Sequence, residues 1–149
     1  MSVRLRIRKY FNQHKGISLS TKDKDMISKG EKACKRYVQR LFKRSFTKIR
    51  PDFLKDPKTK RNLELDLYND SLKLGIEYNG IHHYEYTKRF HKTYSDFRKQ
   101  QERDALKKQL CKENGVILIV VPYAVDCIPS YLLRRARSLF PERFTTPKV

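Results

Sequence analysis

Hydrophobic and polar residues alternate with period two in the middle of this chain, and this alternation predicts a β-hairpin. Over residues 63–68, leucines at every second position alternate with Glu64, Asp66 and Tyr68, which predicts a strand with one apolar face. Residues 72–79 repeat the alternation directly after an Asn-Asp turn signal. The short connection indicates that the two strands pair in an antiparallel hairpin.

Other spacings predict the remaining elements. They are a helix over about 29–44, a short extended piece around 49–54, a helix over about 96–114, a strand over 116–121 and a helix over 129–140. Ser28 and Glu31 have the spacing of a capping box, which places the start of the first helix. The run from Val116 to Val121 is continuously apolar, so we expect a strand in the middle of the sheet, buried on both faces.

This order of elements predicts an α/β fold. We expect a mixed β-sheet flanked by helices, in the order αβββαβα, formed by residues 28–149. Residues 1–27 are polar and basic, and we interpret them as an N-terminal arm.

The charge is strongly positive and unevenly distributed. The 149 residues include 35 Lys and Arg against 16 Asp and Glu, a net charge of +19, and residues 1–61 alone carry a net +15. Such an excess predicts a polyanionic partner, and we expect DNA, with RNA not excluded. The expected phosphate contacts are the basic residues Arg4, Arg6, Arg8, Lys48, Arg50, Lys58, Lys60 and Arg61.

The composition limits which classes of protein this chain can belong to. Hydrophobic residues make up 38% of the chain, which is enough for a packed core, but no apolar run is long enough to cross a bilayer. The N-terminus has no hydrophobic stretch of the signal-peptide kind, and the three cysteines are scattered. We therefore expect an intracellular protein of the cytoplasm or nucleus, acting as a monomer or homodimer without a membrane or small-molecule cofactor.

One acidic island interrupts the basic chain, and it contains Asp66 and Glu77. If the leucine faces of both hairpin strands point into the core, these two carboxylates project together from the opposite side. Two neighbouring carboxylates can hold Mg²⁺ or Mn²⁺ together with a substrate phosphate. The alternative is that both acids belong to a solvated face and pair with nearby Lys and Arg.

Three segments resemble the PD-(D/E)XK, or restriction-endonuclease-like, nuclease superfamily. They are LELDLYN, LKLGIEYNGIHHYE and QQERDALKKQLCKENGVILIVVPY, and the resemblance covers about residues 28–125. It is strongest toward the branch with Vsr-type mismatch nickases, related homing endonucleases and small nucleases of bacteria and large DNA viruses. The stretch IEYNGIHHY matches that branch's pattern Ile-Glu-x-Asp-Gly-x-x-His-Tyr. The resemblance implies a restriction-endonuclease-like α/β fold for residues 28–149. It also implies a Mg²⁺-dependent endodeoxyribonuclease that hydrolyses phosphodiester bonds, by nicking or by cleavage at junctions or mismatches.

The resemblance also implies roles for individual residues. Asp66 and Glu77 match the metal-binding acids, with the carbonyl of Tyr78 as a further ligand, and His83 matches a general acid or base. Glu31 resembles the helix acid that supports the metal through water. Asn79 departs from the pattern, because it stands in place of the superfamily's Lys and of this branch's usual Asp. Arg103 or Lys107 on the next helix could supply the missing positive charge.

The sequence is also compatible with other sites and with another function. Asp52 with Glu64 and Asp66 spells a second register of the motif, which would demote Glu77. His82, His83, His91 and Cys111 could be assembled into a zinc site, although their spacing fits no common pattern. Because of Asn79, the chain could also be an inactive DNA-binding or packaging protein on a nuclease fold.

Overall fold

The computed structural model describes residues 21–145, with side chains described from residue 29. The elements are α2 (Thr21–Phe42), β1 (Thr47–Ile49), β2 (Leu65–Asn69), β3 (Leu74–Asn79), α3 (Tyr94–Glu113), β4 (Ile117–Pro122) and α4 (Ile128–Leu139). Three single-turn 3₁₀ helices lie at Asp52–Leu54, Ile81–His83 and Pro141–Arg143. The strands form one sheet in the order β1-β2-β3-β4, antiparallel except for the parallel pair β3-β4. The expected mixed α/β class is confirmed.

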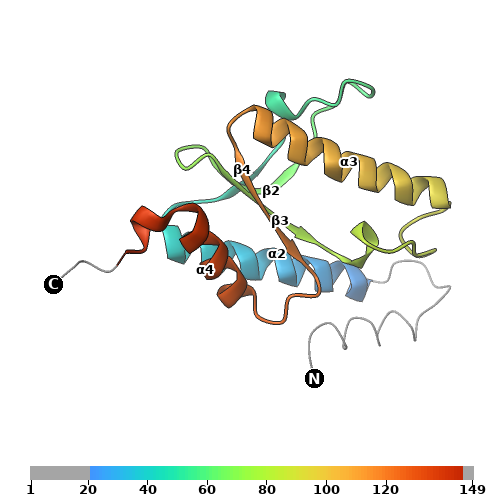
Figure 1. The fold of residues 1–149 in the computed structure, drawn as a ribbon. Helices are drawn as coiled ribbons and strands as arrows, with labels where there is room; N and C mark the ends of the chain where they lie inside the picture. The colour runs from blue at the N-terminus through green and yellow to red at the C-terminus, as the bar shows by residue number, and fades with distance from the viewer. Residues whose placement is uncertain (1–20, 146–149) are drawn as a thin grey trace.

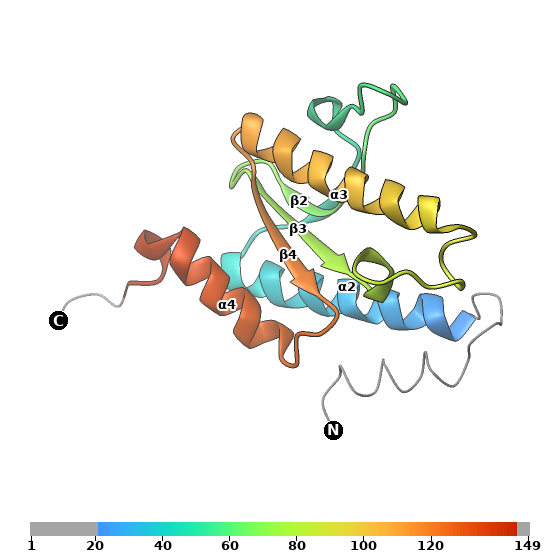
Figure 2. The same ribbon diagram turned by 45° about the vertical axis from the view of Figure 1, so that its right-hand side comes forward.

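Helices cover both faces of the sheet (Figures 1 and 2). On one face, α2 and α4 pack on the sheet around a large apolar cluster that contains Val38, Ile76 and Leu132. On the other face, α3 packs over a smaller cluster that contains Leu54 and Cys111. No helix among the described residues is long and apolar enough to cross a membrane.

The prediction that residues 116–121 form the middle strand is wrong. β4 lies at an edge of the sheet, whereas β3 is the strand in which every residue is buried. The apolar run of β4 has another cause: α3 and α4 both pack against this strand, so that it is shielded from both sides although it has only one strand neighbour.

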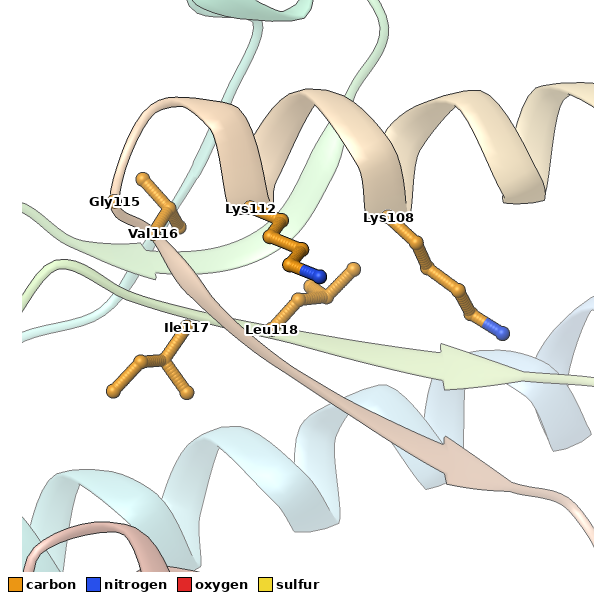
Figure 3. A pocket seen from close by; sticks show the side chains of 6 residues that line it. All are labelled: Lys108, Lys112, Gly115, Val116, Ile117 and Leu118. Carbon is orange, nitrogen blue, oxygen red and sulfur yellow. The ribbon is translucent and has the colours of Figure 1, made fainter.

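The outer edge of β4 is protected by side chains. The Tyr131 hydroxyl donates to the Val120 carbonyl at 2.9 Å, which satisfies one edge acceptor. Lys108 and Lys112 project from α3 beside Leu118 and line a shallow pocket of about 390 Å³ at the start of β4 (Figure 3). Charged side chains at an exposed edge discourage pairing with a further strand.

The predicted start of the first helix is wrong. α2 begins at Thr21, so Ser28 and Glu31 lie inside the helix and do not form its capping box, and the expected boundary at residue 27 falls within α2. A capping box is present at the start of α3, where Thr93 and Asp96 exchange side-chain to backbone hydrogen bonds.

The alternation over residues 63–67 is broken at Asp66. Leu65 packs in the cluster under α3, whereas Leu67 packs in the cluster formed with α2 and α4. The β2–β3 ladder pairs Leu67 with Ile76 and goes no further toward Asp66, and the β1–β2 register is also irregular here. A strand irregularity of this kind redirects a side chain locally.

Candidate active site

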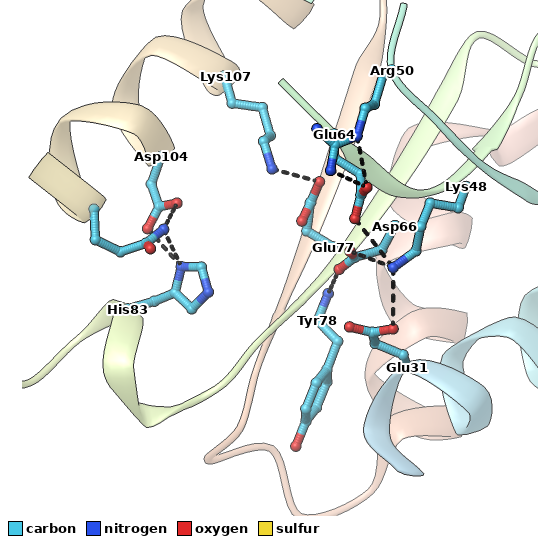
Figure 4. Close-up of polar contacts among 11 residues, drawn as sticks. Glu31, Lys48, Arg50, Glu64, Asp66, Glu77, Tyr78, His83, Asp104 and Lys107 are labelled. Carbon is cyan, nitrogen blue, oxygen red and sulfur yellow. Dashed lines mark hydrogen bonds and ion pairs between the residues drawn. The ribbon is translucent and has the colours of Figure 1, made fainter. Parts of the chain in front are cut away.

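Asp66 lies at the point where β2 and β3 stop pairing. Its Oδ2 accepts a hydrogen bond at 3.2 Å from the backbone N–H of Tyr78, so a carboxylate takes the place of the missing strand partner (Figure 4). The Asn79 carbonyl accepts from Tyr123 N–H on the β4 side at 2.8 Å. Since neighbouring residues of a strand direct their backbone groups to opposite edges, the Tyr78 carbonyl points toward β2, the edge on which Asp66 lies.

Glu77 is buried, with 7% of its side chain exposed, and faces α3. Its Oε1 accepts a hydrogen bond at 2.9 Å from Lys107 Nζ, itself only 16% exposed. Burial raises the pKa of Glu77 to about 8; the Lys107 charge opposes this shift and the neighbouring Asp66 carboxylate adds to it. Asp66 and Glu77 are therefore close enough to repel each other, and a cation between them would relieve that repulsion.

The inward face of α3 is polar. Phe97 and Cys111 are buried near the two ends of the helix, and Gln100, Asp104 and Lys107 lie between them at intervals of three and four residues. This spacing places all five side chains on one face. The helix therefore delivers three polar groups toward β3 and the segment that follows it.

His83 is held by Asp104, which Gln100 holds in turn. Its Nδ1 lies 2.8 Å from Asp104 Oδ2 and 3.3 Å from Gln100 Nε2, and Gln100 also donates to Asp104 Oδ1 at 3.1 Å. Because a carboxylate only accepts, Nδ1 carries the proton, which leaves Nε2 available for proton transfer. Asp104 and Gln100 were not identified from the sequence. The signal that could have revealed them is their helical spacing with Lys107, which places all three on one face of α3.

Lys48 lies among the acids on the other side of β2. Its Nζ is 3.2 Å from Glu64, 3.8 Å from Glu31 and 3.9 Å from Asp66. Burial would lower the pKa of Lys48, but the hydrogen bond with Glu64 and the three negative charges raise it. Burial and the Asp66 charge raise the pKa of Glu31, and the Lys48 charge partly opposes this rise.

Close packing of α2 against β3 places Glu31 in this group. A Cβ added to Gly30 would lie 2.2 Å from the ring of Tyr78, so a side chain at this position would push α2 away from the strand. Gly30 thus permits the short approach that brings the next residue, Glu31, to the Lys48 ammonium beside Asp66.

These residues fit a hard divalent cation. The two carboxylates of Asp66 and Glu77 and the carbonyl of Tyr78 are oxygen donors, which Mg²⁺ and Mn²⁺ prefer. No three His, Cys, Asp or Glu side chains within residues 29–145 form a complete metal-binding group. Mg²⁺ commonly binds one or two carboxylates and completes its shell with water and substrate phosphate.

Other predicted site residues lie outside this arrangement. Arg103 is exposed and donates to Gln100 Oε1 at 2.9 Å, so of the two basic candidates on α3 it is Lys107 that contacts Glu77. Asn79 is buried at the end of β3. The Asp52 carboxylate accepts a hydrogen bond from Asn62 at 2.9 Å.

The predicted phosphate contacts divide into three groups. Lys48 and Arg50 are both engaged with Glu64, Arg50 at 2.9 Å. Three exposed residues follow the Asp52–Leu54 turn: Lys58, Lys60 and Arg61. Arg4, Arg6 and Arg8 lie outside the described residues.

The histidines considered for zinc do not converge with the cysteine. His82 stacks on Phe90 with ring centroids 4.5 Å apart, and His91 stacks on Tyr86 at 5.9 Å. Cys111 is buried in the apolar cluster under α3. His82 Nδ1 is buried without a hydrogen-bond partner, and burial lowers the pKa of this ring to about 3.

Comparison with known proteins places the chain among viral relatives. It is 41% identical over 145 residues to "Uncharacterized protein 307L" of Invertebrate iridescent virus 6, covering 87% of this chain and 74% of that protein. It is 47% identical over 113 residues to "Uncharacterized protein 094L" of Frog virus 3, covering 75% and 73%. "Uncharacterized protein 033L" of Invertebrate iridescent virus 3 is 43% identical over 114 residues, and the chain spans only 59% of its length.

No protein-family model matches the chain, and no solved structure matches it. The identity to 307L extends over more than two thirds of both proteins. The chain therefore belongs to the family of protein 307L of Invertebrate iridescent virus 6 and protein 094L of Frog virus 3.

Proposed function

We propose that this protein is a Mg²⁺- or Mn²⁺-dependent endonuclease that hydrolyses phosphodiester bonds in DNA, on a restriction-endonuclease-like fold. One observation supports it above the others: Asp66 and Glu77 meet where the β2–β3 ladder ends, and Lys107 brings an ammonium to Glu77 from α3. This ammonium supplies the positive charge that Asn79 lacks in the resemblance to PD-(D/E)XK nucleases.

Each residue has a distinct task in this proposal. Asp66, Glu77 and the Tyr78 carbonyl hold the metal, which when bound polarises the phosphoryl oxygen and lowers the pKa of a coordinated water. Lys107 stabilises the negative charge that develops on the phosphate. Glu31 supports the site from α2 through water.

We assign proton transfer to His83. With Nδ1 directed at Asp104, its Nε2 can exchange a proton with the attacking water or with the leaving oxygen. Asp104 fixes the ring and its tautomer, and Gln100 fixes the Asp104 carboxylate by donating to Oδ1; we assign both residues positioning roles.

The charge of the chain indicates the substrate and setting. A net charge of +19 favours a nucleic acid as partner, and we propose duplex DNA as the substrate. Because the relatives are viral proteins, we place the activity in the cytoplasm or nucleus of an infected cell. A single site of this kind nicks one strand, so cutting both strands requires a homodimer or two successive events.

A nicking assay on supercoiled plasmid tests the proposal. We expect conversion to open circles with Mg²⁺ or Mn²⁺, and loss of this activity in Asp66→Ala and Glu77→Ala. Asp66→Ala should bind DNA in EDTA no more weakly than the wild type, because it removes a negative charge near phosphate. Asp52→Ala is the matched control, since Asp52 is an acid outside the site, and it should retain activity.

A DNA-binding or packaging protein without turnover is the second candidate. Asn79 favours it, and so do Lys48 and Lys107, which already pair with the acids that a metal would need. Intact but retarded plasmid at every tested Mg²⁺ and Mn²⁺ concentration, with the variants unchanged, would support this candidate and exclude the nuclease.

A further inference from the structure

A second basic surface lies on the side of α2 that faces α4. It is an open groove of about 670 Å³, called here the α2–α4 groove, and its lining consists of Ala33, Arg36, Tyr37, Gln39, Arg40 and Pro129. Arg36 and Arg40 lie one helical turn apart and are both exposed.

The surroundings of the groove are positive. Exposed basic residues of α2 and the turn after it are Lys29, Lys32, Lys35, Arg36, Arg40, Lys43 and Arg44. Within residues 29–145 none of them has an ion-pair partner, whereas Glu31, the acid among them, pairs with Lys48. The α4 sequence contains no acidic residue.

The amino end of α4 contributes to the same surface. Pro129 lies in the first turn of this 12-residue helix, so the positive end of the helix dipole is at the groove. The two guanidinium groups offer paired N–H donors that match phosphate oxygens. Tyr37 and Pro129 add an apolar floor suited to sugar.

We propose that the α2–α4 groove binds the phosphate backbone of the nucleic-acid substrate at a point separate from the cleavage site. This inference rests on the proposed function for the identity of the substrate. An acidic protein segment is the rival occupant. The overall charge of +19 favours the nucleic acid, because its phosphates can neutralise the groove and the remaining basic surface together.

The groove and the acids lie on opposite flanks of α2. Nine residues separate Glu31 from Arg40, which is two and a half helical turns and about 13.5 Å along the axis. The width of the helix adds to this axial length, so at a rise of about 3.4 Å per nucleotide a strand that contacts both sites spans at least about four nucleotides. The substrate is therefore a nucleic acid that reaches across α2, either a duplex that extends beyond the cleaved bond or a branched molecule.

Binding of a fluorescein-labelled DNA duplex, followed by anisotropy in EDTA, tests the groove apart from catalysis. The double variant Arg36→Gln/Arg40→Gln should bind about tenfold more weakly, because two charge-assisted contacts are lost. Its slope of log affinity against log salt should be smaller by about 2, one for each lost phosphate contact. Glutamine keeps the helix propensity of α2, so the fold is retained.

The matched control is Lys108→Gln/Lys112→Gln. This pair is also exposed, also one turn apart on a helix, and removes the same charge from the outer edge of β4. It should bind nearly as well as the wild type. Equal weakening of DNA binding in the two double variants would overturn the groove proposal, because it would show only the effect of net charge.

Three outcomes separate this inference from the proposed function. Selective loss of DNA binding in the groove variant supports the inference. If the wild type binds and cleaves DNA while the groove variant is unchanged in both, the inference fails and the nuclease stands. If the wild type does not bind DNA, both fail, and binding of a fluorescent polyglutamate peptide that depends on the two arginines would identify the rival occupant.

Discussion

Lys107→Met should destabilise the metal-free protein in a way that depends on pH. Lys107 is the ammonium that pairs with the buried Glu77 carboxylate at 2.9 Å. Breaking such a pair by removing one partner costs about 3 to 5 kcal/mol when the other charge stays buried. Glu77 can avoid that cost by taking up a proton, and burial and Asp66 already raise its pKa to about 8.

The direction of the pH dependence follows from this raised pKa. A carboxyl group whose pKa is higher in the folded state than in the unfolded state opposes folding once the pH is high enough to ionise it. At about pH 9 the wild type keeps an ionised Glu77 beside Lys107, so the variant should lose about 3 kcal/mol. At about pH 6 Glu77 is protonated in both proteins, and the loss should be only about 1 kcal/mol, the value of one hydrogen bond.

Urea unfolding in EDTA at these two pH values measures the difference. Glu77→Gln combined with Lys107→Met should recover most of the loss at high pH, because no buried charge remains. Lys108→Met, at the neighbouring exposed position, should change stability by less than about 0.5 kcal/mol at either pH. A loss that is equal at both pH values, or that the double variant does not recover, would refute the buried ion pair.

Two further predictions concern the histidines. Because burial lowers the pKa of His82 to about 3 from 6.5, the folded state resists its protonation, so acidification from about pH 7.5 to about pH 5 should remove about 2 kcal/mol of stability. His82→Phe, which preserves the stack on Phe90, should remove that part of the pH dependence in thermal unfolding; an unchanged profile would contradict it. Asp104→Asn should slow cleavage about 10- to 100-fold without weakening DNA binding, with partial recovery in Asp104→Glu, and an unaltered rate would exclude Asp104 from positioning His83.

Local patterns predicted the elements, and tertiary packing decided their places. The period-two alternation located β2 and β3 to within about two residues, and the continuous apolar run located β4. That run could not distinguish a central strand from an edge strand covered by two helices, because both are shielded on both faces. The start of α2 was missed because a polar stretch without apolar periodicity carries little signal for a helix.

For the candidate site, the sequence indicated the residue types but only part of the geometry. Asp66 and Glu77 do lie near each other, but at a break in the alternation at Asp66 rather than on the regular pleat that was expected. Strand irregularities of this kind depend on packing from both faces, which no local pattern encodes. Asp104 was missed for a related reason: polar residues on the inward face of α3 look like surface positions until the partner of that face is known.

The most direct test of the account is the position of Mn²⁺ in crystals of the protein soaked with this ion. Anomalous scattering should show an ion bound by carboxylate oxygens of both Asp66 and Glu77, at about 2.0 to 2.2 Å for a magnesium-like site. The Lys107 ammonium should remain beside Glu77, and the same soak of Asp66→Ala crystals should show no ion there. An ion bound elsewhere in the wild type, or no ion between these two side chains at millimolar Mn²⁺, would contradict the proposed catalytic site.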